Sequence, residues 1–256
     1  MQIVIRPDRN TACATAASLI ASQLNTKPAS VLGLATGRTM ESVYDALVDL
    51  HEAGAVGFSA ATSFNLDEYL AIAPDDPRSY RSTMDRLLFD RNDIDLARTH
   101  VPHGSGPGSG GAAYEALIRD AGGIDLQLLG IGENGHIGFN EPLSSFASRT
   151  REVTLAPATR RQNAALFDGD EDAVPKRAIT MGIATVLEAR RILLVVTGRA
   201  KAGILARAVE GPVTAMIGAT ALHFHPDCLV VADEDAAGNL AEREYYDAMA
   251  AGSQEP

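Results

Sequence analysis

The segment Thr36-Gly37-Arg38-Thr39 combines hydroxyl side chains, a glycine and a cation directly after the apolar run at residues 31–34. Gly37 permits a tight turn, and the free N–H groups at the start of a following helix favour an anion. We therefore expect a phosphate-binding loop at Thr36 to Thr39. An ordinary helix start with Thr39 as its N-cap is the alternative interpretation.

Two adjacent carboxylates, Asp67 and Glu68, follow the β-rich run at residues 63–66. Where the chain turns after a strand, only one side chain of such a pair can easily point into a cleft. A partly desolvated carboxylate in that position is suited to taking a proton from carbon. A pair of solvated surface acids is the alternative.

A histidine surrounded by regularly spaced glycines forms the third candidate. Glycine occurs at every third position over residues 132–138, around His136. The unperturbed pKa of histidine, about 6.5, suits proton transfer at neutral pH. The neighbours Asn134 and Glu141 favour acid-base chemistry over a purely structural histidine, because they can orient and polarise the imidazole.

The order of apolar and amphipathic stretches predicts the fold that positions these residues. Short β-rich runs alternate with helix-like segments, which is typical of parallel strands joined by crossover helices. The predicted strands are residues 2–5, 30–34, 63–66, 126–131, 192–197 and 228–232, and the predicted helices include residues 10–24, 40–50 and 112–121. We expect an α/β, Rossmann-like single domain over residues 1–256, with a mostly parallel sheet and helices on both faces. Its ligand site should lie beyond the carboxyl ends of the strands.

One Gly-rich stretch, residues 104–111 (GSGPGSGG), interrupts this alternation. Such a composition is found both in linkers between domains and in surface loops. A surface loop is the preferred interpretation, because strand-like segments of the same character occur on both sides of it.

Composition excludes several classes of function. The 22 Lys and Arg residues against 33 Asp and Glu residues give a net charge of −11, the wrong sign for a protein that binds nucleic acid through its backbone. No apolar run approaches the roughly 18 residues that a membrane span requires, so no membrane partner is expected. The cysteines, Cys13 and Cys228, lie far apart, and no basic-then-apolar leader precedes the first predicted strand. These features predict a cytoplasmic protein.

A metal site is also not expected. His223 and His225 have a spacing that could hold a metal ion. No third ligand is evident near them, and structural sites usually need more than two protein ligands.

Together the motifs resemble glucosamine-6-phosphate deaminases. The resemblance rests on residues 32–37 (LGLATG), 64–69 (FNLDEY) and 132–142 (GENGHIGFNEP), and it continues in the family's order through residues 148–150, 174–176, 198–202 and 225–226. The histidine segment with its Glu-Pro ending is the most specific of these motifs.

The resemblance implies an enzyme that converts glucosamine 6-phosphate to fructose 6-phosphate and ammonia without an organic cofactor. It implies that Asp67 moves a proton between C2 and C1. It further implies that His136 assists ring opening, with Glu141 and Asn134 as its relay, and that the Thr-Gly loop and Lys201 hold the phosphate. The implied partner is a small-molecule sugar phosphate, and homo-oligomer formation is left open.

Two departures from the family pattern affect these roles. The relay position is often Asp, whereas Asn134 cannot stabilise an imidazolium by charge, which leaves that task to the glutamate of the relay. The family also has a phosphate-clamping Arg where this chain has Ala165. Arg38 is the expected replacement, with Arg160 or Arg161 as the other options.

A third departure concerns regulation. Allosteric members use an Arg and a Lys two residues apart, and this chain has Arg151 but Val153. We therefore expect no strong activation by N-acetylglucosamine 6-phosphate.

Two other functions compete with the deaminase. A 6-phosphogluconolactonase-like hydrolase has a related fold, but its histidine motif typically lacks the continuation found at residues 139–142 (FNEP). A non-catalytic sugar-phosphate sensor would carry a helix-turn-helix segment, for which the first predicted strand, beginning at Gln2, leaves no room.

Overall fold

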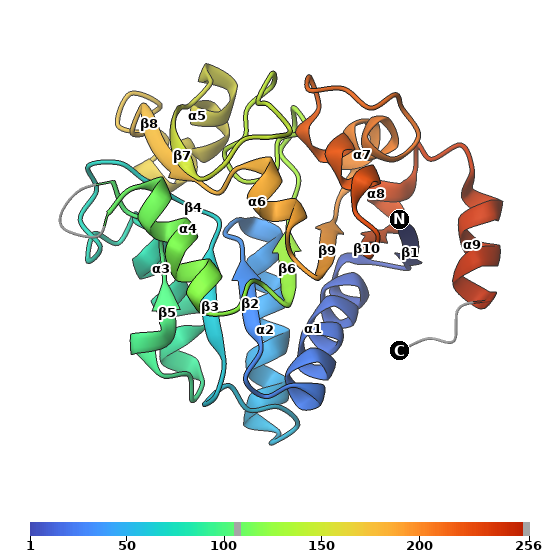
Figure 1. Cartoon of the computed structure of the whole chain (residues 1–256). Helices are drawn as coiled ribbons and strands as arrows, with labels where there is room; N and C mark the ends of the chain where they lie inside the picture. The colour runs from blue at the N-terminus through green and yellow to red at the C-terminus, as the bar shows by residue number, and fades with distance from the viewer. Residues whose placement is uncertain (105–108, 253–256) are drawn as a thin grey trace.

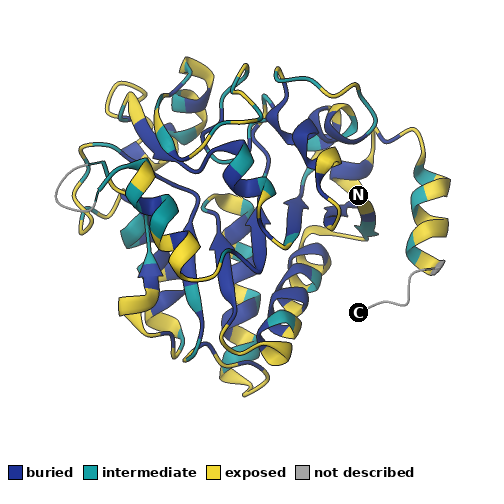
Figure 2. Cartoon of the chain, viewed as in Figure 1, coloured by how far each residue is buried: buried dark blue, intermediate teal, exposed yellow. Residues whose placement is uncertain are grey.

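The computed structural model describes residues 1–104 and 109–252 and is built around a parallel sheet (Figure 1). The sheet has seven strands in the order β1-β10-β9-β6-β2-β3-β5, and all neighbouring strands are parallel. Its strands are β1 (Gln2–Arg6), β2 (Val31–Leu34), β3 (Thr62–Asn65), β5 (Thr99–His100), β6 (Leu126–Leu129), β9 (Arg191–Val196) and β10 (Cys228–Asp233). Every residue of β2, β6 and β10 is buried, which explains why these strands read as continuous apolar runs (Figure 2).

Helices cover this sheet on both faces. The α-helices of the described chain are α1 (Arg9–Thr26), α2 (Arg38–Glu52), α3 (Tyr80–Leu87), α4 (Gly111–Asp120), α5 (Pro157–Asn163), α6 (Ile183–Leu187), α7 (Ala202–Val209), α8 (Glu234–Ala237) and α9 (Arg243–Gly252). Parallel crossover connections are right-handed. The connections through α1, α2 and α3 run toward β5, and those through α4, α6 and α7 run back toward β1, so the two groups lie on opposite faces. Contacts of α2 with both α1 and α3 agree with this placement. The expected Rossmann-like architecture is confirmed.

A second, antiparallel sheet was not predicted from the sequence. Its strands have the order β4-β8-β7, with β4 (Asp67–Tyr69), β7 (Arg151–Thr154) and β8 (Arg177–Thr180). Figure 1 shows this sheet beyond the upper ends of the parallel strands. It covers a small aromatic core of its own, in which Tyr69, Tyr80, Phe139 and Phe167 contact one another.

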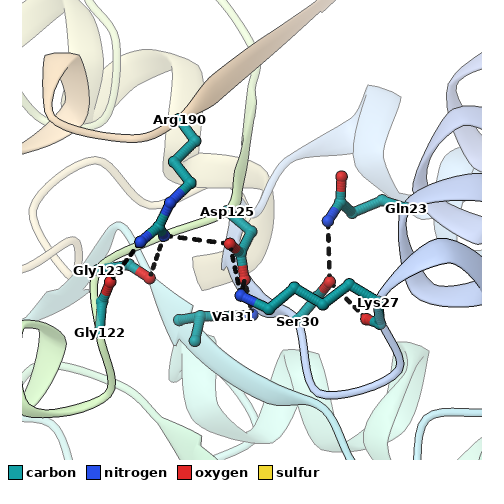
Figure 3. A network of polar contacts seen from close by, with 8 residues as sticks. All are labelled: Gln23, Lys27, Ser30, Val31, Gly122, Gly123, Asp125 and Arg190. Atoms are coloured by element: carbon teal, nitrogen blue, oxygen red, sulfur yellow. Dashed lines mark hydrogen bonds and ion pairs between the residues drawn. The ribbon is translucent and has the colours of Figure 1, made fainter.

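A buried carboxylate ties together the opposite, amino-terminal end of the parallel sheet (Figure 3). Asp125, whose side chain is 5% exposed, precedes β6 and accepts hydrogen bonds from the Val31 N–H at 2.8 Å and from Lys27 Nζ at 2.7 and 2.8 Å. Arg190 Nη1 donates to the same carboxylate at 3.0 Å and to the Gly123 carbonyl at 3.3 Å, and its Nη2 donates to the Gly122 carbonyl at 2.9 Å. This network links the starts of β2, β6 and β9, far from the ends where ligands bind.

Several smaller expectations can be compared with the fold. The strand expected at residues 126–131 ends at Leu129, which leaves the following residues in a loop. The strands on either side of residues 104–111, β5 and β6, belong to the same sheet, while residues 105–108 lie outside the described residues. No helix in the described part of the chain is long and apolar enough to cross a membrane.

The two histidines of the His-x-His motif have separate backbone partners. His223 Nε2 lies 3.1 Å from the Ala208 carbonyl, and His225 Nε2 lies 2.7 Å from the Ala189 carbonyl. The N–H of Asp227 occupies the other ring nitrogen of His225, at 3.1 Å. Both imidazoles therefore hold the segment before β10 in place through hydrogen bonds to the backbone.

Candidate active site

A cleft opens at the carboxyl ends of β2 and β6, the two strands at the centre of the sheet. The connection after β2 leads toward β5 and the connection after β6 leads toward β1, so the two loops separate there. Such a switch point is where open parallel sheets bind ligands. The residues that line the cleft include Thr36, Gly37, Arg38, Thr39, Asp67, His136 and Lys201. Seven of the nine candidate residues from the sequence thus share one cleft.

The loop after β2 presents the start of α2 to this cleft. The helix begins at Arg38, and Gly37 occupies the N-cap position with φ of 125°, a value that favours glycine. No side chain caps this helix, and the N–H groups of Met40 and Glu41 bond the Gly37 carbonyl, so the N–H groups of the first two helical residues are the ones left without a helical partner. Thr39 lies inside the helix, and its Oγ1 is 3.0 Å from Thr197 Oγ1 at the end of β9, so the N-cap interpretation of Thr39 is wrong. An anion is the natural partner for the free N–H groups.

Asp67 lies at the junction of the two sheets. It follows β3 after a single residue and pairs with Thr180 of β8. The side chain lines the cleft although the residue is only 6% exposed. Burial and the neighbouring Glu68 carboxylate raise the pKa of Asp67 to about 8, although the N–H of Phe139 opposes the shift. A carboxylate with that pKa is a stronger base than an ordinary aspartate and is poised near neutral pH.

Glu68 has a different task from its neighbour. Its Oε1 accepts the backbone N–H groups of Tyr69 at 2.8 Å and Tyr80 at 3.0 Å, and its Oε2 accepts that of Arg81 at 2.9 Å. These bonds fix the start of α3 against β4. The expectation that only one of the two acids faces the cleft is confirmed.

His136 sits in the loop after β6 with its imidazole packed against Gly132. A Cβ at position 132 would lie 2.3 Å from His136 Nε2, so only glycine leaves room for the ring. On the other side of the loop Gly138, with φ of 54°, lies beside Thr180 and Asp67, since its Cβ would lie 2.9 Å from Thr180 Oγ1 and 3.4 Å from Asp67 Oδ2. The glycine spacing therefore brings the histidine loop and the aspartate together.

Glu141 and Asn134 lie behind His136 rather than in the cleft. Glu141 Oε2 is 3.6 Å from His136 Nδ1, longer than an ordinary hydrogen bond. Burial raises the pKa of Glu141, but interactions with His136 and Thr159 and a hydrogen bond from the Ala156 N–H outweigh it and lower that pKa to about 2. Glu141 is therefore ionised at neutral pH and faces the imidazole as a carboxylate.

Asn134 was expected to orient the imidazole of His136, but its side chain binds Glu141 and the backbone of His136 instead. Its Nδ2 donates to Glu141 Oε2 at 2.9 Å, and its Oδ1 accepts the backbone N–H of His136 at 3.1 Å. The amide thus holds the glutamate and the loop, and it makes no hydrogen bond to the ring of His136.

Cations gather at the end of the cleft beside the Thr-Gly loop. Burial lowers the pKa of Lys201, the Glu133 carboxylate opposes that shift, and the positive charge of Arg38 adds to it. Arg38 and Lys201 both line the cleft and are near enough for their charges to interact.

The other two arginines proposed as replacements lie elsewhere. Arg160 donates to the Glu171 carbonyl and to Asp172, while Arg161 and Ala165 are exposed and do not line the cleft. The cleft residues that the sequence did not single out include Arg9 and Tyr80. Arg9 follows the carboxyl end of β1, and the rule that located the other site residues applies to it as well.

Comparison with known proteins places this geometry in a family. The family described as glucosamine-6-phosphate isomerases/6-phosphogluconolactonase matches residues 8–230. The chain belongs to this family. Among members of the glucosamine-6-phosphate isomerase/6-phosphogluconolactonase family, a glucosamine-6-phosphate deaminase of Rhodopirellula baltica is 52% identical over 245 residues, which cover 95% of this chain and 97% of the relative. The resemblance seen in the motifs is confirmed.

Solved structures separate the two branches of the family. A monomeric glucosamine-6-phosphate deaminase is 41% identical with a TM-score of 0.89, covering 93% of this chain and 100% of that one. A 6-phosphogluconolactonase from Leishmania guyanensis is 17% identical with a TM-score of 0.71, covering 92% of this chain and 97% of that one. The second likeness extends to the fold alone.

Proposed function

We propose that this chain is a glucosamine-6-phosphate deaminase, which converts glucosamine 6-phosphate and water to fructose 6-phosphate and ammonia. The observation that carries the proposal is the cleft itself. It is lined by a buried carboxylate of raised pKa, by an imidazole, and by a helix start with cations. The deaminase relatives, at 52% and 41% identity, support the same activity.

The first step opens the sugar ring. His136 transfers a proton to or from the ring oxygen and the C1 hydroxyl, and the ionised Glu141 stabilises the charge that the imidazole gains. Opening produces an aldehyde at C1, which acidifies the hydrogen on C2.

Asp67 then carries the proton from C2 to C1. The carboxylate removes the C2 proton and leaves an enol-type intermediate, and it returns a proton to C1. The nitrogen is now bonded to C2 as an imine, which water hydrolyses to the ketose and ammonia. A base with a pKa near 8 is matched to this weakly acidic C–H, and burial keeps its proton from exchanging freely with solvent.

The phosphate binds at the other end of the cleft. The N–H groups at the start of α2, the hydroxyls of Thr36 and Thr39, and the cations Arg38 and Lys201 supply donors for it. Arg38 takes the place of the arginine absent at Ala165. No organic cofactor enters this sequence of steps.

The organisation of the working enzyme is part of the same proposal. Residues 1–256 act as one domain in the cytoplasm, with a sugar phosphate as the partner. The 41% identical deaminase is monomeric, which supports a monomer here as well. Light scattering of the purified protein measures this directly, and a mass well above 26.9 kDa would contradict it.

One experiment tests the activity against its rival. The purified protein is incubated separately with glucosamine 6-phosphate, galactosamine 6-phosphate and 6-phosphogluconolactone, and ammonia, ketose phosphate and acid release are measured. We expect equal amounts of ammonia and fructose 6-phosphate from the first substrate. Acid release from the lactone without ammonia from either amino sugar would favour the lactonase, and binding without turnover would favour a sensor.

A further inference from the structure

Arg9 reaches the phosphate end of the cleft from outside the Thr-Gly loop. It is the first residue of α1, and its Nη2 donates to the Arg38 carbonyl at 2.5 Å. Its side chain lines the same cleft as Arg38 and Lys201. One turn later in α1, Cys13 Sγ lies 3.8 Å from the Thr39 carbonyl, so the first turn of α1 is packed against the start of α2.

The electrostatics around Arg9 argue for an anionic ligand. Arg9 and Arg38 are each the first residue of a helix, where the helix dipole disfavours positive charge. Among the residues that the structure describes, neither arginine nor Lys201 forms an ion pair with a carboxylate. Three positive charges thus line one cleft in a chain whose net charge is −11, and the Glu133 carboxylate, which also lines the cleft, offsets only part of them. An anion bound between them relieves their mutual repulsion.

We propose that Arg9 is a phosphate-binding residue that supplies the third cation to the substrate's phosphate. Its hydrogen bond to the Arg38 carbonyl fixes the guanidinium at the start of α2, so that one face of the group remains available to phosphate oxygens. The proposal rests on the function proposed above, because it names a further determinant of the same site.

Three substitutions separate charge from hydrogen bonding. Arg9→Ala removes both, Arg9→Gln keeps a donor for the Arg38 carbonyl without the charge, and Arg9→Lys keeps the charge without the planar fork. Arg199→Ala is the matched control, because Arg199 is exposed and lies two residues from Lys201 but does not line the cleft. Each variant is assayed for KM and kcat with glucosamine 6-phosphate, for kcat/KM with unphosphorylated glucosamine, and for inorganic phosphate binding by calorimetry.

The expected result is specific to phosphate. Arg9→Ala should raise KM and the Kd of inorganic phosphate about ten-fold, or about 1.4 kcal/mol, while kcat and the reaction with glucosamine stay within about two-fold. Arg9→Gln should resemble the alanine variant, Arg9→Lys should recover part of the loss, and Arg199→Ala should match wild type.

Other outcomes overturn the proposal. Unchanged KM and phosphate Kd in Arg9→Ala would show that the guanidinium does not contact the phosphate. Equal losses with glucosamine and with glucosamine 6-phosphate would show a structural role only. Because calorimetry needs no turnover, an inactive wild type would refute the deaminase while the phosphate Kd of Arg9→Ala still decides the role of Arg9.

Discussion

Replacing Asp67 by Asn should reduce activity and at the same time change how stability depends on pH. The amide has nearly the shape of the carboxyl and carries no charge that burial would disfavour, so the fold is retained. It cannot take a proton from C2, and loss of a general base typically costs about 10²- to 10⁴-fold in kcat. In the wild type, kcat/KM should rise with pH up to about 8, because only the ionised carboxylate is active.

The change in stability follows from the raised pKa. The folded protein holds the Asp67 proton up to a pH of about 8, whereas the unfolded chain releases it near the ordinary value of 3.8. The unfolded state therefore binds fewer protons between these values, and wild-type stability falls as pH rises through that window. At about 1.4 kcal/mol per pH unit, Asp67→Asn should gain about 2 to 3 kcal/mol relative to wild type between pH 5 and pH 7.

Urea unfolding at pH 5, 6, 7 and 8.5 measures this gain. Asp45→Asn is the control, because Asp45 is 59% exposed and pairs only with Arg91 at the surface. The stability difference between Asp67→Asn and wild type should widen with pH and level off above about 8. A difference that stays constant from pH 5 to 8.5 would refute the raised pKa and, with it, the reason for choosing Asp67 as the base.

Four further outcomes are expected. His136→Gln should slow the reaction of the closed sugar more than that of a substrate fixed in the open form, and equal losses in parallel assays would remove the ring-opening role. Arg38→Ala should raise KM about 10- to 150-fold, because it removes a charge-assisted hydrogen bond to the phosphate. Adding Ala165→Arg to that variant should recover part of the lost affinity. An unchanged KM in Arg38→Ala would place Arg38 away from the phosphate. Asp125→Ala should lower the free energy of unfolding by about 2 to 3 kcal/mol without changing kcat, because it leaves the Val31 N–H unpaired; unchanged urea midpoints would contradict this. N-acetylglucosamine 6-phosphate should leave the saturation curve unchanged, and a clear shift to lower substrate concentration would show an effector site.

The parallel sheet and the centre of the cleft could be predicted because both leave local signals. Strands buried on both faces read as apolar runs, and the residues directly after them must lie at one edge of the sheet. That rule alone brought together the Thr-Gly loop, Asp67 and His136. The sequence shows the glycines at 132 and 138 as a regular spacing, but only the fold shows the reason for it, which is close packing of position 132 against His136 and of position 138 against Thr180.

The antiparallel sheet gave no comparable signal. Its strands have three or four residues, and β7 alternates half-buried and exposed positions with charged side chains among them. Segments this short do not show a hydrophobic periodicity that would distinguish a strand from a loop.

Side-chain partners were also beyond the sequence. Asn134 was expected to contact the imidazole, but its amide reaches Glu141 and the backbone of His136. The sequence allows Thr39 as an N-cap, but the helix begins one residue earlier, and the Thr39 hydroxyl contacts that of Thr197 in the loop directly after β9. Arg9 lies 29 positions from Arg38, and no local pattern joins them.

Proton transfer by Asp67 is the central claim, and glucosamine 6-phosphate deuterated at C2 tests it most directly. The initial rates with labelled and unlabelled substrate are compared, and the fructose 6-phosphate formed is analysed for deuterium at C1. If the buried carboxylate carries the proton from C2 to C1, the labelled substrate should react more slowly and part of the deuterium should appear at C1. Equal rates together with product free of deuterium at C1 would contradict transfer by Asp67.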